Sequence, residues 1–296
     1  MSRPLVSVVT TSYNQARFLA ETIESVLGQD YEPLEYLVVD DGSTDGSVGV
    51  IRRYEDRLAW WTAQENAGQA AALNRGFARA TGEVLSFLSS DDTLLPGTVG
   101  RVVEAFEAEP DLLMVYGDVL ITDERSEVVE YHASGEWQLP TMARTVYTVH
   151  QPASFFTRRA WELAGPFDER SWGLFDIEFG LRLAAAGRAL HLHEPLATFR
   201  LHPASKQLSR HARMGDECLR LARDFFGSPE LPEPLRPYAR DARATLHRRA
   251  ALNFAAAGER GRARRAFLRS LLLSPHGLTT KQGKRLARTL LPGRGG

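Results

Sequence analysis

Residues 36–45 read YLVVDDGSTD, an apolar, β-branched run that ends in two aspartates and a glycine-containing loop. Two more segments have this form: the run 5–10 is followed by TSYN at 11–14, and the run 83–88 is followed by SSDD at 89–92. Such runs, bounded by turn residues, are typical of buried strands. The sequence therefore predicts several strands that each end in a polar loop.

Helical patterns separate the predicted strands. Apolar residues recur at helical spacing from Phe18 to Leu27. After a predicted strand at 58–61, small residues at 69–80 indicate another helix. A further helix is predicted to begin at Pro96, after the strand at 83–88. This alternation predicts βαβ units and an α/β fold with a mostly parallel, twisted sheet flanked by helices. Ligands of such sheets lie beyond the carboxyl ends of the strands. We therefore expect the polar loops to converge on one binding edge.

Three acidic pairs stand out in the sequence: Asp40/Asp41, Asp91/Asp92 and Asp176/Glu178. Neighbouring carboxylates repel each other, and Mg²⁺ or Mn²⁺ shared with a phosphate relieves that repulsion. Asp-Asp-Gly-Ser is also ordinary turn and helix-capping chemistry, so both interpretations stay open for the first pair. For the second pair we favour a metal site, because it follows an equivalent strand.

The composition is that of a globular protein. The 296 residues are 43% hydrophobic and 25% charged, which excludes a disordered chain, a collagen-like fibre and a disulfide scaffold. The single Cys218 cannot form an internal disulfide, so a reducing compartment is expected. The first residues lack the apolar core of a secretory signal, and no apolar stretch approaches the ~20 residues that span a bilayer. We expect a cytoplasmic protein, at most peripheral at the inner face of the cell membrane.

The charge is unevenly distributed along the chain. Residues 260–296 contain ten basic residues and no acidic one, whereas the rest of the chain is acidic. An acidic body argues against nucleic acid as the main ligand. Segment 283–291 places Leu286 and Leu290 on one helical face, so the basic C-terminus is predicted to dock on an anionic membrane or another anionic partner. A solvated, frayed terminus is the alternative.

A change of pattern near residue 204 predicts a domain boundary. We expect an α/β domain at 1–203 and a helical C-terminal extension at 204–296. Residues 247–275 resemble one helical hairpin of the tetratricopeptide type. One repeat cannot bury its own apolar face, so we expect it to pack as an appendage. A generic helix pair is the alternative.

The motifs together resemble those of a family 2 glycosyltransferase. The resemblance rests on VSVV at 6–9, YN at 13–14, VVDDGSTD at 38–45, GQ at 68–69, NRG at 74–76 and FLSSDD at 87–92. It continues through FDE at 167–169, DIE and LRL within 176–183, and FRLH at 199–202. The motifs run in family order over about residues 4–203, and the C-terminal third lies outside the resemblance.

The resemblance implies a GT-A fold, in which one α/β domain binds a nucleotide-diphosphate sugar. It implies inverting transfer of the sugar, expected to come from a UDP-sugar, to a hydroxyl of a saccharide, glycolipid, lipid-linked or glycoprotein acceptor, with Mn²⁺ or Mg²⁺ on the diphosphate. Cell-surface polysaccharide biosynthesis is the expected setting.

The resemblance also assigns roles to single residues. The implied donor-nucleotide residues are Thr11, Tyr13, Asp40, Asp41, Asn74 and Ser90, among which Asp41, with Asp40 beside it, accepts hydrogen bonds from the base. Asp91 is the implied metal ligand, with Asp92 and His202 in support. Asp176 is the implied catalytic base, which removes the acceptor hydroxyl proton.

Two positions depart from the family pattern. Ser89 stands where the family often has aspartate, so the implied metal site has one carboxylate fewer and its metal affinity is expected to be weak. Phe175 stands where glutamate often precedes the base, which is expected to alter acceptor contacts.

Further candidates lie on the expected acceptor side: His150, Gln151, Trp172 and Glu178. Trp172 precedes Asp176 by about one helical turn and is placed to stack on a sugar face, although a packed loop aromatic gives the same pattern. His191 and His193 alternate on a predicted strand at a metal-compatible spacing. No carboxylate pair accompanies them in the sequence, so we expect a structural role.

The sequence bears differently on three alternative classes of function. A nucleotidyltransferase would carry a glycine-rich basic loop after the first strand, where this chain has TSYNQ at 11–15. A dinucleotide-binding dehydrogenase would need Gly-x-Gly-x-x-Gly after a strand, which the sequence lacks. A non-catalytic nucleotide-sugar binding module stays open because of Ser89, and turnover of the donor separates it from an enzyme.

Overall fold

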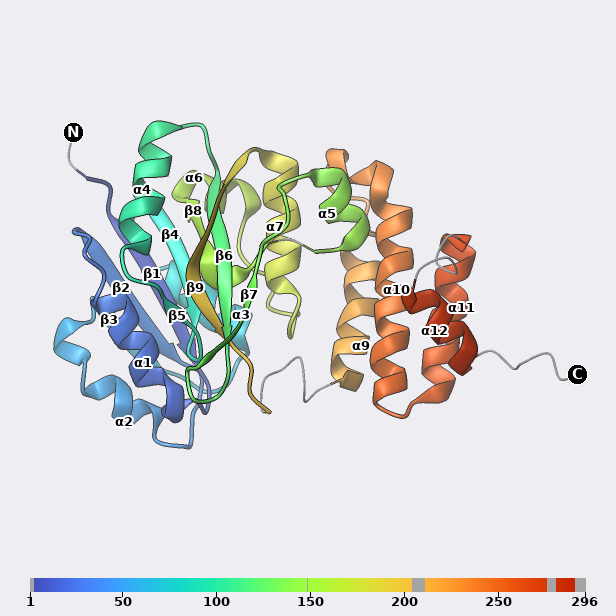
Figure 1. Ribbon diagram of the computed structural model, residues 1–296, viewed down its shortest axis with the longest axis horizontal. Coiled ribbons are helices and arrows are strands. Elements are labelled where there is room, and N and C mark those ends of the chain that lie inside the picture. The colour runs from blue at the N-terminus through green and yellow to red at the C-terminus, as the bar shows by residue number, and fades with distance from the viewer. Residues whose placement is uncertain (1–2, 148, 204–210, 276–280, 291–296) are drawn as a thin grey trace, which may run out of the picture. The chain divides into compact units, whose positions relative to one another are not determined.

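The computed structural model describes residues 3–147, 149–203, 211–275 and 281–290 (Figure 1). The chain forms two compact units. The sheet unit consists of Met1–Trp137, Val149–Phe175 and Ala186–His202, and the helical unit consists of Gln138–Thr148, Asp176–Ala185 and Pro203–Gly296. Two short segments from before residue 203 thus group with the C-terminal helices. The division into domains at 1–203 and 204–296 stays a prediction.

One sheet contains the strands of the sheet unit. They are β1 (Val6–Ser12), β2 (Leu34–Asp40), β3 (Trp60–Ala63), β4 (Val84–Ser89), β5 (Thr93–Leu94), β6 (Met114–Thr122), β7 (Val128–His132), β8 (Ser154–Thr157) and β9 (Ala189–Arg200). Their order is β3-β2-β1-β4-β8-β6-β9-β5, with β7 paired to β6. Strands β1 to β4 are mutually parallel and β9 is parallel to β6, while β8 is antiparallel to both of its neighbours. The predicted α/β fold class, with a mostly parallel sheet, is confirmed.

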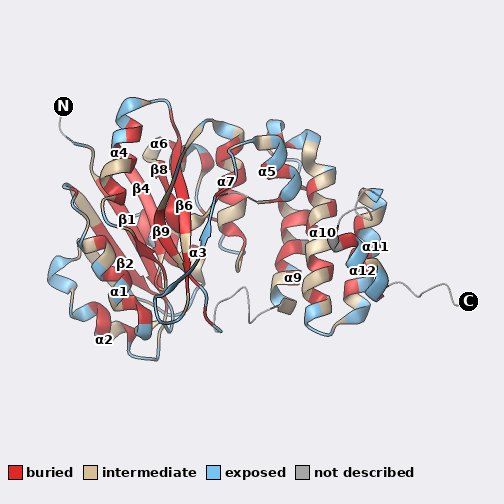
Figure 2. Ribbon diagram, viewed as in Figure 1, coloured by how far each residue is buried: buried red, intermediate tan, exposed pale blue. Residues whose placement is uncertain are grey.

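Helices cover both faces of the parallel strands. Helices α1 (Ala16–Leu27) and α4 (Thr98–Ala108) share one apolar core with Val8 of β1 and Val38 of β2. Helix α3 (Gln69–Phe77) lies against the other face, toward which Val9 points. Burial on both faces explains why the central strands are continuous apolar runs, seen as buried ribbons in Figure 2. The described part of this unit also contains helices α2 (Ser47–Arg52) and α6 (Arg158–Ala164) and the 3₁₀ turns η1 (Glu55–Arg57) and η2 (Gln151–Ala153).

Helix α3 approaches β1 closely at Gly76. A Cβ atom at this position would lie 2.4 Å from Cγ1 of Val9 and 3.5 Å from Cγ2 of Val39. Two carbon atoms cannot pack at the shorter distance in an interior of ordinary density. The helix therefore lies this near the sheet because the residue is glycine. At the first turn of the helix, Gln69 Nε2 donates to Ser89 Oγ at 3.3 Å, at the carboxyl end of β4.

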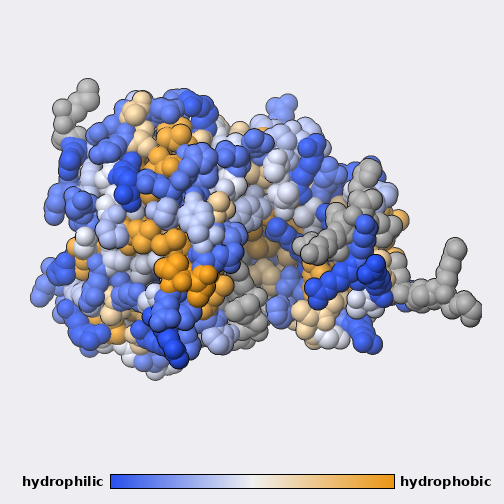
Figure 3. Space-filling view, in the orientation of Figure 1, coloured by the Kyte–Doolittle hydropathy of each residue, from blue (hydrophilic) through white to orange (hydrophobic). Residues whose placement is uncertain are grey.

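Strand β7 is the exposed member of the sheet. All of its residues are exposed, among them Val128 and Val129, and apolar side chains gather on the visible face of the sheet unit in Figure 3.

The helical unit contains α5 (Leu139–Thr145), most of α7 (Phe175–Ala186), α9 (His211–Arg220), the π-helical turn η3 (Leu221–Phe225), the 3₁₀ turn η4 (Glu233–Tyr238), α10 (Ala239–Ala256), α11 (Arg260–Leu273) and α12 (Lys281–Leu290). Gly258 turns the chain between α10 and α11 with a φ of +80°. Phe254 and Phe267, one from each helix, are buried. The hairpin predicted at 247–275 thus matches two described helices, of which the first begins earlier, and its likeness to a tetratricopeptide repeat stays an interpretation.

Helix α12 directs its apolar side chains inward. Leu286 and Leu290 are only 2% and 8% exposed, whereas Lys284, Arg285 and Arg288 are exposed. The apolar face that the sequence analysis associated with lipid docking is therefore packed inside the helical unit. None of the helices in the described part of the chain has the length and apolar character needed to cross a membrane.

Candidate donor site and metal site

The carboxyl ends of β1, β2 and β4 lie level with one another. Ser12 is in register with Asp40, and Thr11 is in register with Ser89. The loops that follow these strands therefore start side by side at one edge of the sheet, which is where the sequence analysis placed the ligand. Thr11 is buried, while Tyr13 is 52% exposed.

Asp41 holds the loop that follows β3. Its Oδ1 accepts hydrogen bonds from Ala67 N–H at 2.9 Å and from Gln64 Nε2 at 2.8 Å, and its Oδ2 accepts from Gly68 N–H at 2.9 Å. Three donors on one buried carboxylate fix the path of this loop. The polar capacity that the sequence analysis assigned to a nucleotide base is thus largely used by the protein itself.

Asp40 retains the unused capacity. Its Oδ1 accepts a hydrogen bond from Ser43 N–H at 2.9 Å, and its Oδ2 is buried without a hydrogen-bond partner among the described residues. An unsatisfied buried carboxylate oxygen is costly, and a ligand N–H would remove that cost. Of the two aspartates, Asp40 is therefore the one with an unused carboxylate oxygen, and that oxygen is buried.

The loops after β1 and β2 are joined by side-chain hydrogen bonds. Asn14, with a φ of +53°, accepts at Oδ1 from Thr44 N–H at 2.8 Å, and Asp45 Oδ2 accepts from Ala16 N–H at 2.9 Å at the start of α1. Burial alone would raise the pKa of Asp45, but its hydrogen bonds from Ser47 and Ala16 outweigh burial and lower it. The carboxylate thus caps a helix whose N–H groups lack partners of their own.

Asp91 and His202 meet at the same edge. The distance from Asp91 Oδ2 to His202 Nε2 is 3.1 Å, and the buried imidazole packs on Phe18 with ring centroids 5.0 Å apart. Asp92 turns inward instead, and its Oδ1 accepts from Arg200 N–H at 2.9 Å. Burial, together with the charge of Asp91, raises the pKa of Asp92 well above its ordinary value. Asp91 and His202 are therefore the adjacent pair suited to a cation, and Asp92 supports the turn.

Arg200 connects this pair to the surrounding elements. Its Nε donates to the carbonyl of Asp91 at 2.8 Å, its Nη1 donates to Ser126 Oγ at 2.8 Å, and its Nη2 donates to Glu21 Oε2 at 2.6 Å. The guanidinium lies over the Phe18 ring at 4.7 Å, and its side chain is 1% exposed. A buried, fully bonded guanidinium holds three separate segments at fixed positions.

Asn74 and Ser90 are both near the edge but differ in their surroundings. Asn74 Nδ2 donates to the carbonyl of Phe167 at 3.0 Å and to Glu169 Oε1 at 2.9 Å, and its Oδ1 accepts from Phe167 N–H at 3.0 Å. Its amide therefore positions the segment 167–169, a role that the sequence analysis did not include. Ser90 is buried within the turn after β4.

Three candidates of the acceptor side lie in the sheet unit, and their surroundings differ. His150 Nε2 lies 2.7 Å from His132 Nδ1, and burial, with the nearby charge of His132, lowers the pKa of His150 to about 4. Gln151 Nε2 donates to the carbonyl of Phe87 in β4. Trp172 is half-buried. The neutral form of His150 is thus the one present at neutral pH.

Asp176 and Glu178 belong to the first turn of α7, in the helical unit. The Asp176 carboxylate is half-buried and accepts from Ile177 N–H at 2.8 Å. Glu178 is buried and lies 3.7 Å from Arg220 of α9, which also pairs with Glu217 at 3.3 Å. The two carboxylates of the DIE motif therefore differ: Glu178 is part of a buried ionic contact, and Asp176 is the more accessible.

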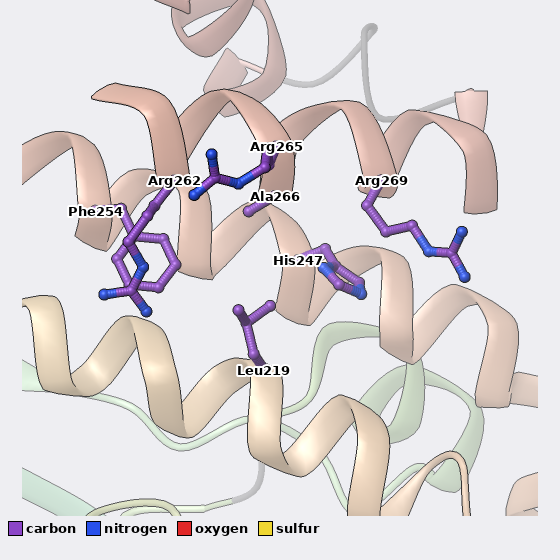
Figure 4. Close-up of a pocket in the computed structure, with 7 residues that line it drawn as sticks. All are labelled: Leu219, His247, Phe254, Arg262, Arg265, Ala266 and Arg269. Atoms are coloured by element: carbon purple, nitrogen blue, oxygen red, sulfur yellow. The ribbon is translucent and has the colours of Figure 1, made fainter. Parts of the chain in front are cut away.

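The helical unit also has a pocket of about 260 Å³ between α9, α10 and α11 (Figure 4). Its lining residues are Leu219, His247, Phe254, Arg262, Arg265, Ala266 and Arg269. Arg262 lies over the Phe254 ring at 3.9 Å and pairs with Glu259 at 2.8 Å. Burial, with the charges of Arg269 and Arg243, lowers the pKa of His247 to about 4. The pocket is thus basic without a charged histidine.

Comparison with known protein families shows where this chain belongs. Residues 7–161, which include β1 to β4 and their polar loops, match the profile of Glycosyl transferase family 2. The chain belongs to this family. The match confirms the resemblance drawn from the sequence motifs.

Relatives in the family share much of the chain. An uncharacterised glycosyltransferase of Nostoc sp. is 32% identical in an alignment of 219 residues that covers 69% of this chain and 67% of the Nostoc protein. The O-antigen biosynthesis protein RfbC of Myxococcus xanthus is 34% identical in an alignment of 207 residues that covers 66% of this chain and 16% of that protein. The chondroitin synthase of Escherichia coli is 27% identical in an alignment of 196 residues that covers 64% of this chain and 28% of that protein. Family 2 relatives of this chain thus include proteins of polysaccharide synthesis.

Solved structures share the fold. The mannosyltransferase PcManGT from Pyrobaculum calidifontis, in complex with GDP-Man and Mn²⁺, has a TM-score of 0.61 at 22% identity and covers 97% of this chain and 81% of its own. Residues 1–349 of S. aureus TarS, in complex with UDP-GlcNAc, have a TM-score of 0.68 at 16% identity and cover 96% and 90%. The GT-A fold expected from the resemblance is thereby shown.

Arg200 is the main contributor to this family 2 site that sequence reasoning missed. The residue stands inside the FRLH motif, two positions before His202, but nothing in the local sequence indicates that its side chain is buried. A lone arginine at a strand end is more often exposed. Its partners come from the turns after β4 and β6 and from α1, which the fold brings together at the end of β9.

Proposed function

We propose that this family 2 protein is an inverting glycosyltransferase that moves a sugar from a UDP-sugar to a hydroxyl of a saccharide or lipid-linked acceptor in cell-surface polysaccharide synthesis. The observation that carries the proposal is the single sheet edge at which Asp40, Asp91 and His202 converge. A donor of this class presents base N–H groups, a diphosphate that departs and a sugar that is transferred. The edge offers a hydrogen-bond acceptor for the base and a cation-binding pair for the diphosphate.

The nucleotide is expected to lie over the ends of β1 and β2. The buried Oδ2 of Asp40 accepts an N–H of the base, which satisfies an oxygen that otherwise lacks a partner. Tyr13, exposed beside it, supplies a ring on which the base or ribose packs. Thr11 lines the same pocket, and Asp41 acts indirectly by fixing the loop after β3.

The residues present fit a divalent cation. Asp91 and His202, 3.1 Å apart, would hold Mn²⁺ or Mg²⁺ once His202 Nε2 gives up the proton that it shares with Asp91, and a carboxylate is the ligand type that both ions prefer. When bound, the metal supplies positive charge to the departing diphosphate. Two protein ligands leave most positions to diphosphate oxygens and water, which agrees with the weak affinity expected from Ser89.

The acceptor hydroxyl is activated by Asp176 in this proposal. Inverting transfer is one displacement at the anomeric carbon: the acceptor oxygen bonds to that carbon, the bond to the diphosphate breaks, and the hydroxyl proton passes to a base. Asp176 is the more accessible carboxylate of its motif, whereas Glu178 is committed to Arg220. His150, Gln151 and Trp172 remain candidates for acceptor contacts.

A panel of nucleotide sugars tests the proposed function. The full chain, with Mn²⁺ or Mg²⁺ and an oligosaccharide acceptor, is expected to release UDP from one UDP-sugar, and the product anomer is expected to be inverted relative to the donor. Release of nucleotide diphosphate and the anomeric configuration by NMR are the measurements. Binding of UDP-sugars with no release of UDP in the presence of any acceptor would instead indicate a non-catalytic binding module.

The basic end of the helical unit is proposed to bind anionic surfaces by charge. Lys284, Arg285 and Arg288 lie on the exposed side of α12, and Figure 3 shows strongly hydrophilic surface over this part of the unit. Because the leucines of α12 are packed inward, the contact is expected to be electrostatic and peripheral, at the inner face of the membrane.

Co-sedimentation with phosphatidylglycerol vesicles checks this contact. Neutralising all three basic residues, Lys284→Gln, Arg285→Gln and Arg288→Gln, is expected to weaken binding on the order of 100-fold at low salt, at about 1 kcal/mol for each charge lost. Binding of the wild type is expected to fall steeply with salt. Equal binding by the two proteins at low salt would contradict the proposal, and the donor panel is unaffected by either result.

A further inference from the structure

A cluster of unused ligand groups lies in the sheet unit near the amino end of β9. His191 is in register with Tyr116 of the neighbouring strand β6, and the two rings stack with centroids 4.7 Å apart and an interplanar angle of 9°. The His191 side chain is only 5% exposed. Because β9 ends at Arg200, beside Asp91, this cluster lies at the opposite end of the strand from the donor edge.

One nitrogen of His191 is committed and the other is not. Its Nε2 lies 2.7 Å from Asp118 Oδ1, and since a carboxylate only accepts, Nε2 carries the proton. Asp118 is itself held by Ser134 N–H at 2.8 Å and by the Tyr131 hydroxyl. Nδ1 is therefore left with a lone pair, is buried, and has no hydrogen-bond partner among the described residues. A carboxylate that orients an imidazole in this way is typical of metal-binding histidines.

Two further ligand groups lie close to the His191 ring. Glu136 Oε1 lies 3.8 Å from Nδ1, and the His193 ring lies 3.9 Å from the His191 ring between centroids. One ligand atom from each of the three residues lies within 4.8 Å of the others. Two ligand atoms on a tetrahedral zinc, each about 2.0–2.2 Å from the metal, are separated by roughly 3.4 Å. Small side-chain rotations therefore close the cluster around one ion.

The backbone places both outer ligands. His193 has a φ of +52°, in the left-handed region that favours glycine, at a point where the pairing of β6 with β9 shifts register. A bulge of this kind redirects side chains, and strain in it is common at functional sites. On the other side, Gly135 O accepts from the Tyr116 hydroxyl at 2.9 Å, and Trp137 Nε1 donates to Gly187 O at 3.1 Å. Glu136 is thus fixed between two anchored residues.

We propose that Glu136, His191 and His193 form a zinc site, with water as the fourth ligand, separate from the metal site of the donor edge. Two imidazoles and a carboxylate suit Zn²⁺ better than the oxygen-preferring Mg²⁺. The bound ion would join the segment after β7 to the start of β9, two parts of the chain more than 50 residues apart in sequence. The site is therefore structural in its effect, and it stabilises the folded sheet unit by binding only the folded state.

Calorimetric titration of Zn²⁺ into the full chain tests the site. The protein carries no histidine tag and is first stripped with chelator, and Co²⁺ in place of Zn²⁺ reports tetrahedral coordination by its visible absorption. The test variant is Glu136→Gln with His193→Asn, both at exposed positions, since asparagine tolerates the left-handed backbone. Its Zn²⁺ affinity is expected to fall on the order of 100-fold, with loss of the Co²⁺ band and of the rise in Tm that Zn²⁺ gives the wild type.

Two controls separate this site from others. His132→Ala removes an exposed histidine that pairs with His150, and it is expected to leave the high-affinity Zn²⁺ titration unchanged. Asp91→Asn, which alters the donor edge, is likewise expected to leave that titration unchanged. Equal Zn²⁺ affinity and an equal Co²⁺ spectrum in the wild type and the double variant would overturn the proposal, as would the absence of Zn²⁺ binding by the stripped wild type.

Discussion

Replacement of Asp176 by asparagine is expected to lower sugar transfer by roughly two to four orders of magnitude, the usual worth of a general base. The amide is isosteric and retains the hydrogen bond from Ile177 N–H, so the first turn of α7 is preserved. A base acts on the acceptor, so affinity for UDP is expected to stay close to that of the wild type. Initial rates with the best donor of the panel, together with a UDP titration, measure both.

Glu178→Gln is the matched control for this experiment. Glu178 is buried and 3.7 Å from Arg220, so loss of its charge is expected to lower the Tm while leaving the rate per folded molecule near that of the wild type. If Glu178→Gln abolishes transfer in folded protein and Asp176→Asn does not, the two roles are reversed. If neither variant affects transfer, the base lies elsewhere in the chain.

Asp91→Asn is expected to weaken UDP binding by roughly 10- to 100-fold in the presence of Mn²⁺ and to remove most of its dependence on the metal. The side chain loses the charge that a cation needs but keeps an oxygen toward His202, so the fold of the turn is retained. Calorimetric titration of UDP into the wild type and the variant, each with Mn²⁺ and then with chelator, gives the four affinities required.

Ser89→Asp provides the opposite test of the same metal site. Ser89 is half-buried two residues before Asp91, and a carboxylate there restores the ligand that the family often has. The variant is expected to bind UDP more tightly with Mn²⁺ and more weakly with chelator, because the added charge repels both Asp91 and the diphosphate when no cation is present. A wild type whose UDP affinity is the same with Mn²⁺ and with chelator would contradict the metal assignment.

The arrangement of the sheet edge was predictable because it depends on short-range patterns. A β-branched run followed by Asp-Asp-Gly-Ser reports a strand and its end, and the parallel topology then brings successive strand ends together. The register of Ser12 with Asp40 agrees with this expectation. The different surroundings of Asp40 and Asp41 were not predictable, since they depend on the loop after β3, whose N–H groups reach one carboxylate and not the other.

The surroundings of His191 and His193 were not predictable from the sequence. The sequence predicts a structural role for both histidines because no carboxylate pair accompanies them, yet the structure brings Asp118 and Glu136 beside His191. Those carboxylates come from β6 and from the segment after β7, and only the pairing of β6 with β9 joins them. Contacts between residues so far apart in the chain leave no periodic trace. Asn74, bound to residues 167–169, is a second example.

The close packing at Gly76 constrains which sequences this fold tolerates. Any side chain there would collide with Cγ1 of Val9, so a substitution requires either that Val9 shifts or that the helix moves away from the sheet that it covers. Because α3 begins beside Ser89 and carries Asn74, such a displacement reaches the donor edge without touching a ligand. The glycine thus works as a spacer between two layers. Gly76 stands among polar motif residues because helix α3 and the sheet lie close together at this point. Its presence does not indicate which sugar is transferred.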